Sequence, residues 1–464
     1  VPNAAGMVGD RVVHQRWDDT PVWRPDENGI VRNNDFFGGS LAGITSQLDY
    51  LQSMGVGTLY LCPIFESDSN HRYDTADYRR IDPMLGTEED FRTLCREARC
   101  RGIRVMLDGV FNHTGNNSRY FNAQGFYPEL GAAQSRESPY YSWYSFHPWP
   151  DDYDAWWGIK TLPAVQESTD SYRRFIIRDH DSVVRHWLRQ GASGWRLDVA
   201  DELPDDFIAE IRDAMEQENP DSFLLGEVWE DGSNKVAYSQ RRRYLLGSET
   251  HGLMNYPFRT AALDWLRGGD ASCFRDTMET IREHYPRPAF YSALNILGTH
   301  DTPRILTLLG AEHVPGTKDA RAAYRLSPEE RQKGEARLRV GEMLLYCFPG
   351  SPTVYYGDEA GMEGFEDPLN RKTYPWDRQL RRHRPSLQDG DLTYVYAQGG
   401  ALVLRRQLGD EITVAALNAG ETAVEVSLPW PRDLAREALS FQQFFAPGGK
   451  LRLRLPPVSG MILI

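Results

Sequence analysis

Short apolar runs alternate with amphipathic stretches along most of this chain. In Leu41–Met54, the residues Ile44, Leu48 and Leu51 recur at helical spacing, which predicts a helix with one buried face. The apolar runs are bounded by turn residues, a pattern typical of buried strands. Repeated alternation of strand and helix indicates parallel β–α units. The other predicted helices are Thr87–Arg101, Tyr172–Arg189, Asp205–Glu218 and Arg321–Cys347.

Eight of the apolar runs predict strands, enough to close a (β/α)8 barrel. We therefore predict an α/β fold in which residues 1–113 and 170–390 form a TIM barrel with its active site at the carboxyl ends of the strands. The predicted strands are Val12–Trp17, Thr58–Phe65, Arg104–Asp108, Gly194–Asp198, Ser222–Glu227, Gly252–Tyr256, Asn295–Gly298 and Thr353–Gly357.

Two regions interrupt the alternation. Residues 114–169, rich in Trp and Tyr, are too long for a structureless loop and predict a subdomain inserted after the third strand. Residues 391–464 show short alternating strands and predict a C-terminal antiparallel β-sandwich domain. The stretch from Trp376 to Asp391 should supply the last barrel helix, but Pro385 interrupts it, so we expect that helix to be very short or partly absent from this sequence.

The composition narrows the range of partners. Lys and Arg number 52 against 66 Asp and Glu, which gives a net charge of −14. An acidic surface repels nucleic acid and anionic membranes, so we expect neither as a partner. Aromatic residues make up 12% of the chain, which suits both a large core and the stacking of rings on sugars.

The cysteines and the N-terminal residues give information on the cellular location of the protein. The five cysteines are odd in number and contain no C-x-x-C spacing, which predicts reduced, mostly buried thiols and favours the cytoplasm. Val1 to Asp10 lack the pattern of a signal peptide, yet secretion stays open because a leader could have been removed. No run of about 18 apolar residues exists, so we expect no membrane span. The oligomeric state is left open.

Carboxylates end four of the predicted strands or follow them directly. They are Asp108, Asp198, Glu227 and Asp301. One strand-end acid alone is typical of a turn or a helix cap, but four in one barrel indicate a site. Arg196 lies two residues before Asp198, so the two side chains share a face of the strand, and the cation favours an ionised carboxylate.

Four stretches around these acids resemble, in order, the signature motifs of the alpha-amylase family, glycoside hydrolase family 13. They are Asp108–His113, Gly194–Asp198, Gly226–Trp229 and Gly298–Asp301. Further stretches are similar to the neopullulanase and cyclomaltodextrinase branch or to other family motifs, namely Asn70–Tyr78, Thr161–Gln166, Met254–Pro257 and Tyr355–Glu359. The resemblance covers nearly the whole chain.

The resemblance implies roles for the matching positions. Asp198 would be the nucleophile, Glu227 the acid/base, and Asp301 would hold sugar hydroxyls. Arg196, His113 and His300 would donate hydrogen bonds in the innermost sugar site. The remaining implied substrate-binding residues are Tyr73 stacked under that sugar, Asp108 orienting Arg196, Trp229 beside Glu227, and Asp367 with Arg371 at the next sugar.

Elementary chemistry agrees with these roles. Cleaving an acetal with retention needs two carboxylates about 5–5.5 Å apart, one giving a proton to the leaving oxygen and one attacking the anomeric carbon. Nearby anions and apolar Trp229 favour a protonated Glu227, while Arg196 favours an ionised Asp198. We therefore expect a retaining hydrolase of α-1,4-linked glucans such as starch fragments, pullulan or cyclodextrins.

Three other functions are alternatives to hydrolysis of α-glucans. A transglycosylase or isomerase of the same family would use the same intermediate with a sugar as acceptor. A non-catalytic homologue would need a membrane span, and a metal-dependent hydrolase using His113, His300 and Asp301 fits the pattern less well.

No cofactor is required, but structural calcium is possible because Asn112 resembles a calcium ligand of the family. Trp17–Asn34 does not clearly match the family's calcium loop.

Trp156 and Trp157 are the best candidates for sugar-stacking rings in the inserted segment. They precede the Leu162–Gln166 stretch that resembles a substrate-side motif. Adjacent residues of an extended strand point in opposite directions, so we expect one ring to be exposed to sugar and the other to pack inward.

Overall fold

The computed structural model describes residues 6–8, 10–237, 239–376, 391–438 and 442–464. The chain forms two compact units. The first comprises Val1–Val228 with Gly232–Leu253, and the second comprises Trp229–Asp231 with Met254–Ile464. The predicted domain boundaries follow the sequence pattern instead, and they stay predictions.

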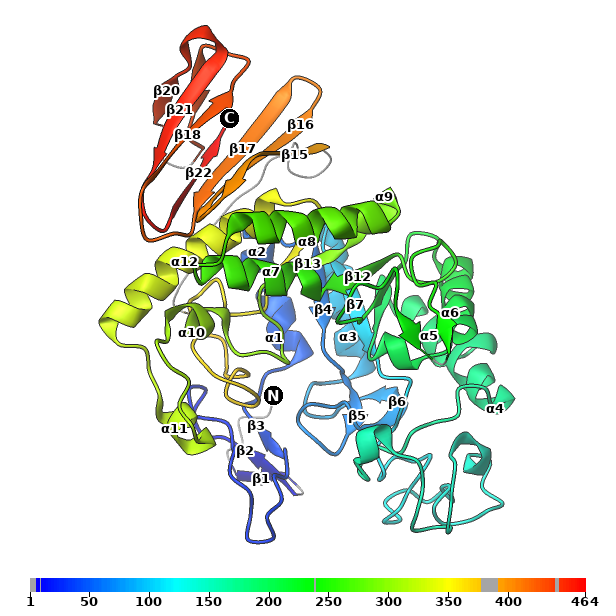
Figure 1. Cartoon of the computed structure of the whole chain (residues 1–464). Helices are drawn as coiled ribbons and strands as arrows, with labels where there is room; N and C mark the ends of the chain where they lie inside the picture. The colour runs from blue at the N-terminus through cyan, green and yellow to red at the C-terminus, as the bar shows by residue number, and fades with distance from the viewer. Residues whose placement is uncertain (1–5, 9, 238, 377–390, 439–441) are drawn as a thin grey trace. The chain divides into compact units, whose positions relative to one another are not determined.

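Parallel strands form the centre of the first unit (Figure 1). Apart from Thr58–Leu61, whose residues are exposed or half-buried, their residues are buried almost without interruption, as expected when both faces of a parallel sheet are covered. The carboxyl ends of parallel strands lie at one edge, which is where the predicted acids fall. In hydrogen-bonded order the strands are β4 (Thr58–Leu61), β7 (Arg104–Gly109), β8 (Gly194–Leu197), β9 (Phe223–Gly226) and the first half of β12 (Gly252–Asn255).

Amphipathic helices cover these strands. In α3 (Glu88–Cys100), the buried residues Phe91, Leu94, Cys95 and Ala98 recur at helical spacing, and Thr87 begins the helix with a capping box. The other helices of this unit are α1 (Leu41–Ser46), α2 (Leu48–Ser53), α4 (Asp170–Arg173), η3 (Arg174–Arg178), α5 (Val183–Arg189), η4 (Ala200–Glu202) and α6 (Asp205–Glu218).

The first predicted barrel strand pairs elsewhere. Within Val12–Trp17 only the beginning is extended, and β2 (Arg11–Val13) joins a separate three-stranded sheet with β1 (Gly6–Val8) and β3 (Asp35–Phe36). Thr58–Phe65 divides into two strands because Pro63 cannot donate to a ladder. Its second part, β5 (Phe65–Ser67), pairs with β6 (Thr75–Ile81), and the short pair β10 (Val236–Ala237) and β11 (Gln240–Arg241) lies farther along the chain.

The predicted long helices are interrupted. Leu41–Met54 is broken at Gln47, and Tyr172–Arg189 is broken between Arg178 and Val183. Arg321–Cys347 is also two helices, because Ser327 forms a capping box and Pro328 occupies the first turn of a new helix. Helical periodicity identified these regions correctly but gave no signal for the breaks.

Aromatic side chains form the core of the inserted segment. Trp143 and Tyr144 are buried and contact Tyr120 and Phe121, so most of the aromatic excess here is core, as expected. Regular elements are limited in this segment to the short helices η1 (Tyr141–Trp143) and η2 (Trp156–Gly158) and a few isolated bridges.

In the second unit, the second half of β12 pairs in parallel with β13 (Leu294–Ile296), which pairs in parallel with β14 (Ser351–Thr353). Its helices are α7 (Tyr256–Leu266), α8 (Ala271–His284), α9 (Arg287–Ser292), α10 (Ile305–Gly310), α11 (Lys318–Ala323) and α12 (Pro328–Cys347). The predicted short last barrel helix falls largely on residues 377–390, which lie outside the described residues.

The C-terminal strands are antiparallel, which confirms this part of the prediction. A four-stranded sheet and two strand pairs enclose a core that includes Val403, Val414, Trp430 and Leu453. The sheet contains β15 (Asp391–Gln398), β16 (Ala401–Leu408), β17 (Glu411–Asn418) and β22 (Ser459–Leu463). The pairs are β18 (Val424–Pro429) with β21 (Lys450–Leu455) and β19 (Leu434–Arg436) with β20 (Gln443–Phe445), and η5 (Pro447–Gly449) connects β20 to β21.

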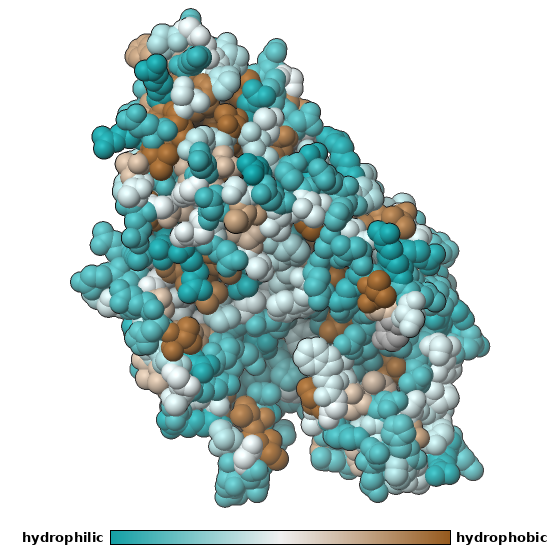
Figure 2. All heavy atoms as spheres, in the orientation of Figure 1, coloured by the Kyte–Doolittle hydropathy of each residue, from teal (hydrophilic) through white to brown (hydrophobic). Residues whose placement is uncertain are grey.

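The face in Figure 2 is mainly hydrophilic with small, separate apolar patches. No described helix is long and apolar enough to cross a bilayer. None of the five cysteines, all within the described residues, forms a disulfide, as predicted, but Cys62, Cys100 and Cys273 are exposed, so the expectation of mostly buried thiols is wrong.

Candidate active site

The first unit brings three of the predicted acids to one edge of its sheet. Asp108 lies in β7, Asp198 directly follows β8, and Glu227 directly follows β9. The strand register pairs Asp108 with Arg196 and Leu197 with Gly226, which places these ends side by side. The prediction of a strand-end carboxylate cluster is therefore confirmed for these residues.

Arg196 connects the three carboxylates. Its side chain is fully buried, and Nη1 donates to Asp108 Oδ1 at 2.8 Å and to Asp198 Oδ1 at 2.7 Å. Its Nη2 forms an ion pair with Glu227 Oε2 at 2.8 Å. Asp198 and Glu227 thus bind the two terminal nitrogens of one guanidinium, so they are neighbours. Their exact separation stays a prediction.

The charges of this cluster oppose one another. Burial raises the pKa of Asp198 well above its usual value, and Glu227 and Asp108 add to the rise while Arg196 opposes it. Burial also raises the pKa of Asp108 against the same opposition. Burial would lower the pKa of Arg196, but Asp108 and Glu227 keep it well above its usual value. One cation cannot offset three carboxylates, so the cluster favours retaining a proton.

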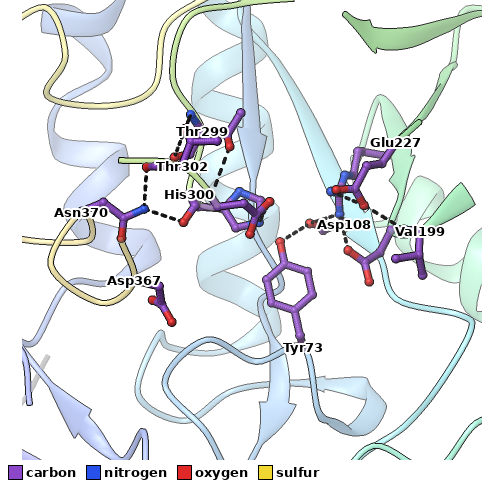
Figure 3. A network of polar contacts seen from close by, with 12 residues as sticks. Tyr73, Asp108, Val199, Glu227, Thr299, His300, Thr302, Asp367 and Asn370 are labelled. Carbon is purple, nitrogen blue, oxygen red and sulfur yellow. Dashed lines mark hydrogen bonds and ion pairs between the residues drawn. The ribbon is translucent and has the colours of Figure 1, made fainter. Parts of the chain in front are cut away.

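Val199 positions Glu227 through its main chain. The residue follows Asp198 and has a left-handed backbone, with φ of 40° and ψ of 51°, a conformation that β-branched residues rarely adopt. In this conformation its N–H donates to Glu227 Oε2 at 2.8 Å (Figure 3). Strained backbone of this kind persists where the surroundings enforce it, often at functional sites.

Two tyrosine hydroxyls also form hydrogen bonds with Asp108. Tyr60 donates its hydroxyl to Asp108 Oδ2 at 2.6 Å. Tyr73 donates its hydroxyl to the same oxygen at 3.0 Å (Figure 3). Arg196 Nη1 also donates to both Asp108 oxygens. Asp108 therefore accepts hydrogen bonds from Arg196 and from both tyrosines, an arrangement consistent with the expected role of orienting Arg196. Tyr60 was not predicted as a site residue, although it lies in a predicted strand. Sugar stacking on Tyr73 stays a prediction.

His113 contacts protein atoms through both ring nitrogens. Nε2 lies 3.1 Å from the Tyr73 carbonyl oxygen, and Nδ1 lies 3.2 Å from Asn112 Oδ1. Burial lowers the pKa of His113 to about 4, so the ring is neutral and only one nitrogen carries a proton. In this structure His113 supports Tyr73, and its predicted hydrogen bond to sugar would have to replace one of these contacts.

The surroundings of Asn112 bear on the calcium expectation. Burial raises the pKa of Glu167 to about 8, although a hydrogen bond with Asn112 opposes the rise. A carboxyl that keeps its proton is a poor calcium ligand. Among the described residues, no three His, Cys, Asp or Glu side chains are grouped to hold a metal. Calcium at Asn112 stays a prediction.

Trp156 and Trp157 form a stack that begins at His113. The Trp156 ring lies 5.4 Å from His113 and 5.0 Å from Trp157, with interplanar angles of 28° and 17°. Trp157 is 78% exposed, and its Nε1 donates to Glu202 at 2.9 Å. One ring is exposed and the other packs on buried His113, as predicted, although the two rings lie nearly parallel instead of pointing in opposite directions as in an extended strand. The pair lies in η2, and the left-handed φ of 50° at Trp157 brings the rings together.

The second unit holds the remaining predicted residues. His300 Nε2 lies 3.2 Å from Asp301 Oδ2, and Arg371 Nη2 lies 3.7 Å from Asp301 Oδ1. Arg371 Nε also pairs with Asp367 at 3.0 Å, so these four polar residues form one cluster. The expected position of Asp301 beside Asp198 and Glu227 stays a prediction.

Trp229 also belongs to the second unit. It is 47% exposed and stacks on Tyr256, with ring centroids 3.9 Å apart at 13°. The stack leaves part of the indole accessible. Its predicted place in the sugar site stays a prediction.

Comparison with known proteins agrees with the motifs. The family described as "Alpha amylase, catalytic domain" matches residues 17–391. An amylopullulanase from Thermoanaerobacterium saccharolyticum is 35% identical over 97% of this chain, which spans only 39% of that protein. A cyclomaltodextrinase from Geobacillus thermopakistaniensis is 33% identical, covering 91% of this chain and 69% of the relative.

A solved structure gives the same result for the fold. The type III pullulan hydrolase from Thermococcus kodakarensis has a TM-score of 0.80 and 28% identity, covering 98% of this chain and 75% of that one. The predicted TIM-barrel architecture is thereby confirmed. Both the sequence match and the carboxylates gathered at the strand ends show that the chain belongs to the alpha-amylase family.

Proposed function

We propose that this protein is a retaining hydrolase of α-1,4-glucosidic bonds in starch-derived glucans. The observation that carries the proposal is the shared guanidinium of Arg196, which holds Asp198 and Glu227 as neighbouring carboxylates. Neighbouring carboxylates suit a double displacement, whereas an inverting enzyme needs room for a water between them.

The proposed reaction has two steps. Glu227 gives its proton to the glycosidic oxygen while an Asp198 oxygen forms a bond to the anomeric carbon and the C–O bond to the leaving sugar breaks. Water then attacks the same carbon, Glu227 takes the proton of that water, and the bond to Asp198 breaks. Arg196 alone faces the carboxylates of Asp108, Asp198 and Glu227, and this excess of negative charge favours keeping one proton in the cluster, which the first step consumes.

The other residues bind sugar in this proposal. Asp301 and His300 accept and donate hydrogen bonds at the innermost ring, and Tyr73 stacks beneath it. Asp367 and Arg371 bind the next ring. The relatives named amylopullulanase and cyclomaltodextrinase make branched, linear and cyclic α-glucans the substrates to test first.

The anomeric form of the first product tests the proposal. With maltooligosaccharides we expect proton NMR to show the α anomer first, with slow mutarotation to β. Chromatography of digests of starch, pullulan and β-cyclodextrin should show shorter sugars, and longer ones would indicate transfer to sugar. Release of the β anomer first, or no cleavage of any of these glucans, would contradict the proposed function.

Trp157 should act as a binding platform distant from the cleaved bond. We expect Trp157→Ala to raise KM for long glucans more than for maltotriose and to leave kcat nearly unchanged, because uniform binding does not accelerate the chemical step. Phe126→Ala is the matched control, since Phe126 is 62% exposed in the same segment but is absent from the His113–Trp156–Trp157 stack. An equal change in KM for short and long substrates would refute the platform.

A further inference from the structure

Asn370 is a fully buried residue whose side chain contacts the loop that carries Asp301. Its Nδ2 donates to the carbonyl oxygen of His300 at 2.7 Å and to that of Thr302 at 2.9 Å (Figure 3). These two carbonyls belong to the residues directly before and after Asp301. One amide group thus connects the main chain on both sides of the exposed carboxylate.

Asn370 is itself held in place. Arg304, also fully buried, donates Nε to the Asn370 carbonyl oxygen at 2.7 Å and Nη1 to Asp358 Oδ1 at 3.1 Å. Within the described part of the chain, Asn370 Oδ1 has no hydrogen-bond partner. A buried acceptor without a partner costs free energy. The Asn370 side chain therefore stabilises the structure only through the two hydrogen bonds that it donates to the loop.

Other hydrogen bonds also hold the loop around Asp301. The Asp301 N–H donates to Thr299 Oγ1 at 3.2 Å, and Arg371 Nε donates to the His300 carbonyl oxygen at 3.1 Å. The Asp301 side chain projects from a backbone whose neighbours His300 and Thr302 are buried. A reacting group must be held to within a fraction of an ångström, and a 1 Å displacement costs about 10²-fold in rate.

We propose that Asn370 is a positioning residue that fixes Asp301 by bridging the carbonyl groups on either side of it. The inference rests on the proposed function, because it assigns Asn370 to the hydrolytic role of Asp301. Asn370 does not contact the sugar. It acts only through the loop, and its effect therefore depends on the presence of the Asp301 carboxylate.

The expected result for Asn370→Ala is a fall in kcat of about 10²-fold with a much smaller change in KM on maltooligosaccharides. Asn418→Ala is the matched control. Asn418 is also fully buried, and its Nδ2 likewise donates to main-chain carbonyls, those of Thr422 at 2.8 Å and Pro456 at 2.8 Å. This variant should lower Tm as Asn370→Ala does while keeping kcat.

Non-additivity supplies the decisive readout. In an Asp301→Ala background, Asn370→Ala should cause no further fall in kcat, because residues that act as a unit are not additive. An additional full loss in that background, or an unchanged kcat in the single variant, would overturn the positioning role. If Asn370→Ala does not fold, Asn370→Ser, which keeps one donor, is measured in both backgrounds under the same criteria. An inactive parent enzyme would instead refute the proposed function.

Discussion

Glu227→Gln is expected to lower kcat on maltooligosaccharides by at least about 10²–10⁴-fold, the usual contribution of general acid–base catalysis. The amide keeps the size of the carboxyl group, and its oxygen can still accept the Val199 N–H, so KM should change little. It cannot give a proton to the leaving oxygen. Aryl maltosides with an acidic leaving phenol need less protonation, and their first step should be much less affected.

A second buried glutamate provides the control for this variant. Glu249 is fully buried, burial raises its pKa to about 7, and it lies outside the carboxylate cluster. Glu249→Gln should therefore keep kcat, because it changes a buried carboxyl to an amide without touching the proposed acid. Near-normal turnover of Glu227→Gln on maltooligosaccharides would assign the proton to another residue.

Arg196→Met is expected to lower the free energy of unfolding by about 3–5 kcal/mol at pH 7, together with a near-complete loss of activity. Removing one partner from a buried ion pair leaves uncompensated charge, which accounts for the size of the effect. The guanidinium now opposes the burial that raises the pKa values of Asp108 and Asp198. Without it, both values should rise further above those of the unfolded chain.

The pH dependence of this loss follows from the direction of those shifts. A folded state with raised carboxyl pKa values binds more protons than the unfolded state, so its stability falls as pH rises through the folded pKa values. Urea unfolding of Arg196→Met should therefore show a smaller deficit at pH 5 than at pH 7. Adding Asp108→Asn should recover part of the deficit by removing one unpaired charge. Equal deficits at both pH values would indicate lost packing instead.

The strand-end acids could be predicted because the barrel pattern fixes where strands end. Asp198 and Arg196 were placed on one face by the two-residue period of a strand, and the structure confirms their contact. The first barrel strand was placed wrongly because an apolar run does not specify its partner. Arg11–Val13 pairs with neighbours on both sides of it in the sequence instead of with β4.

The positioning residues carried no pattern of their own. Nothing in a lone valine indicates the left-handed backbone of Val199, and Asn370 contacts Thr302 across 68 positions of sequence. Tyr60 needed the strand register before its hydroxyl could be placed on Asp108. The orientation of Trp157 depended on a local turn that the assumption of an extended strand left out. Periodicity identifies elements, whereas these contacts depend on tertiary structure.

The chain crosses between its two compact units at three points: after Val228, after Asp231 and after Leu253. No single cut therefore separates them. A fragment ending at Val228 would lack Gly232–Leu253, which includes the start of β12, and one beginning at Met254 would lack Trp229, the ring stacked on Tyr256. Neither half is a self-contained segment for expression or for exchange with a relative. Recombination between homologues would have to transfer both pieces of a unit together.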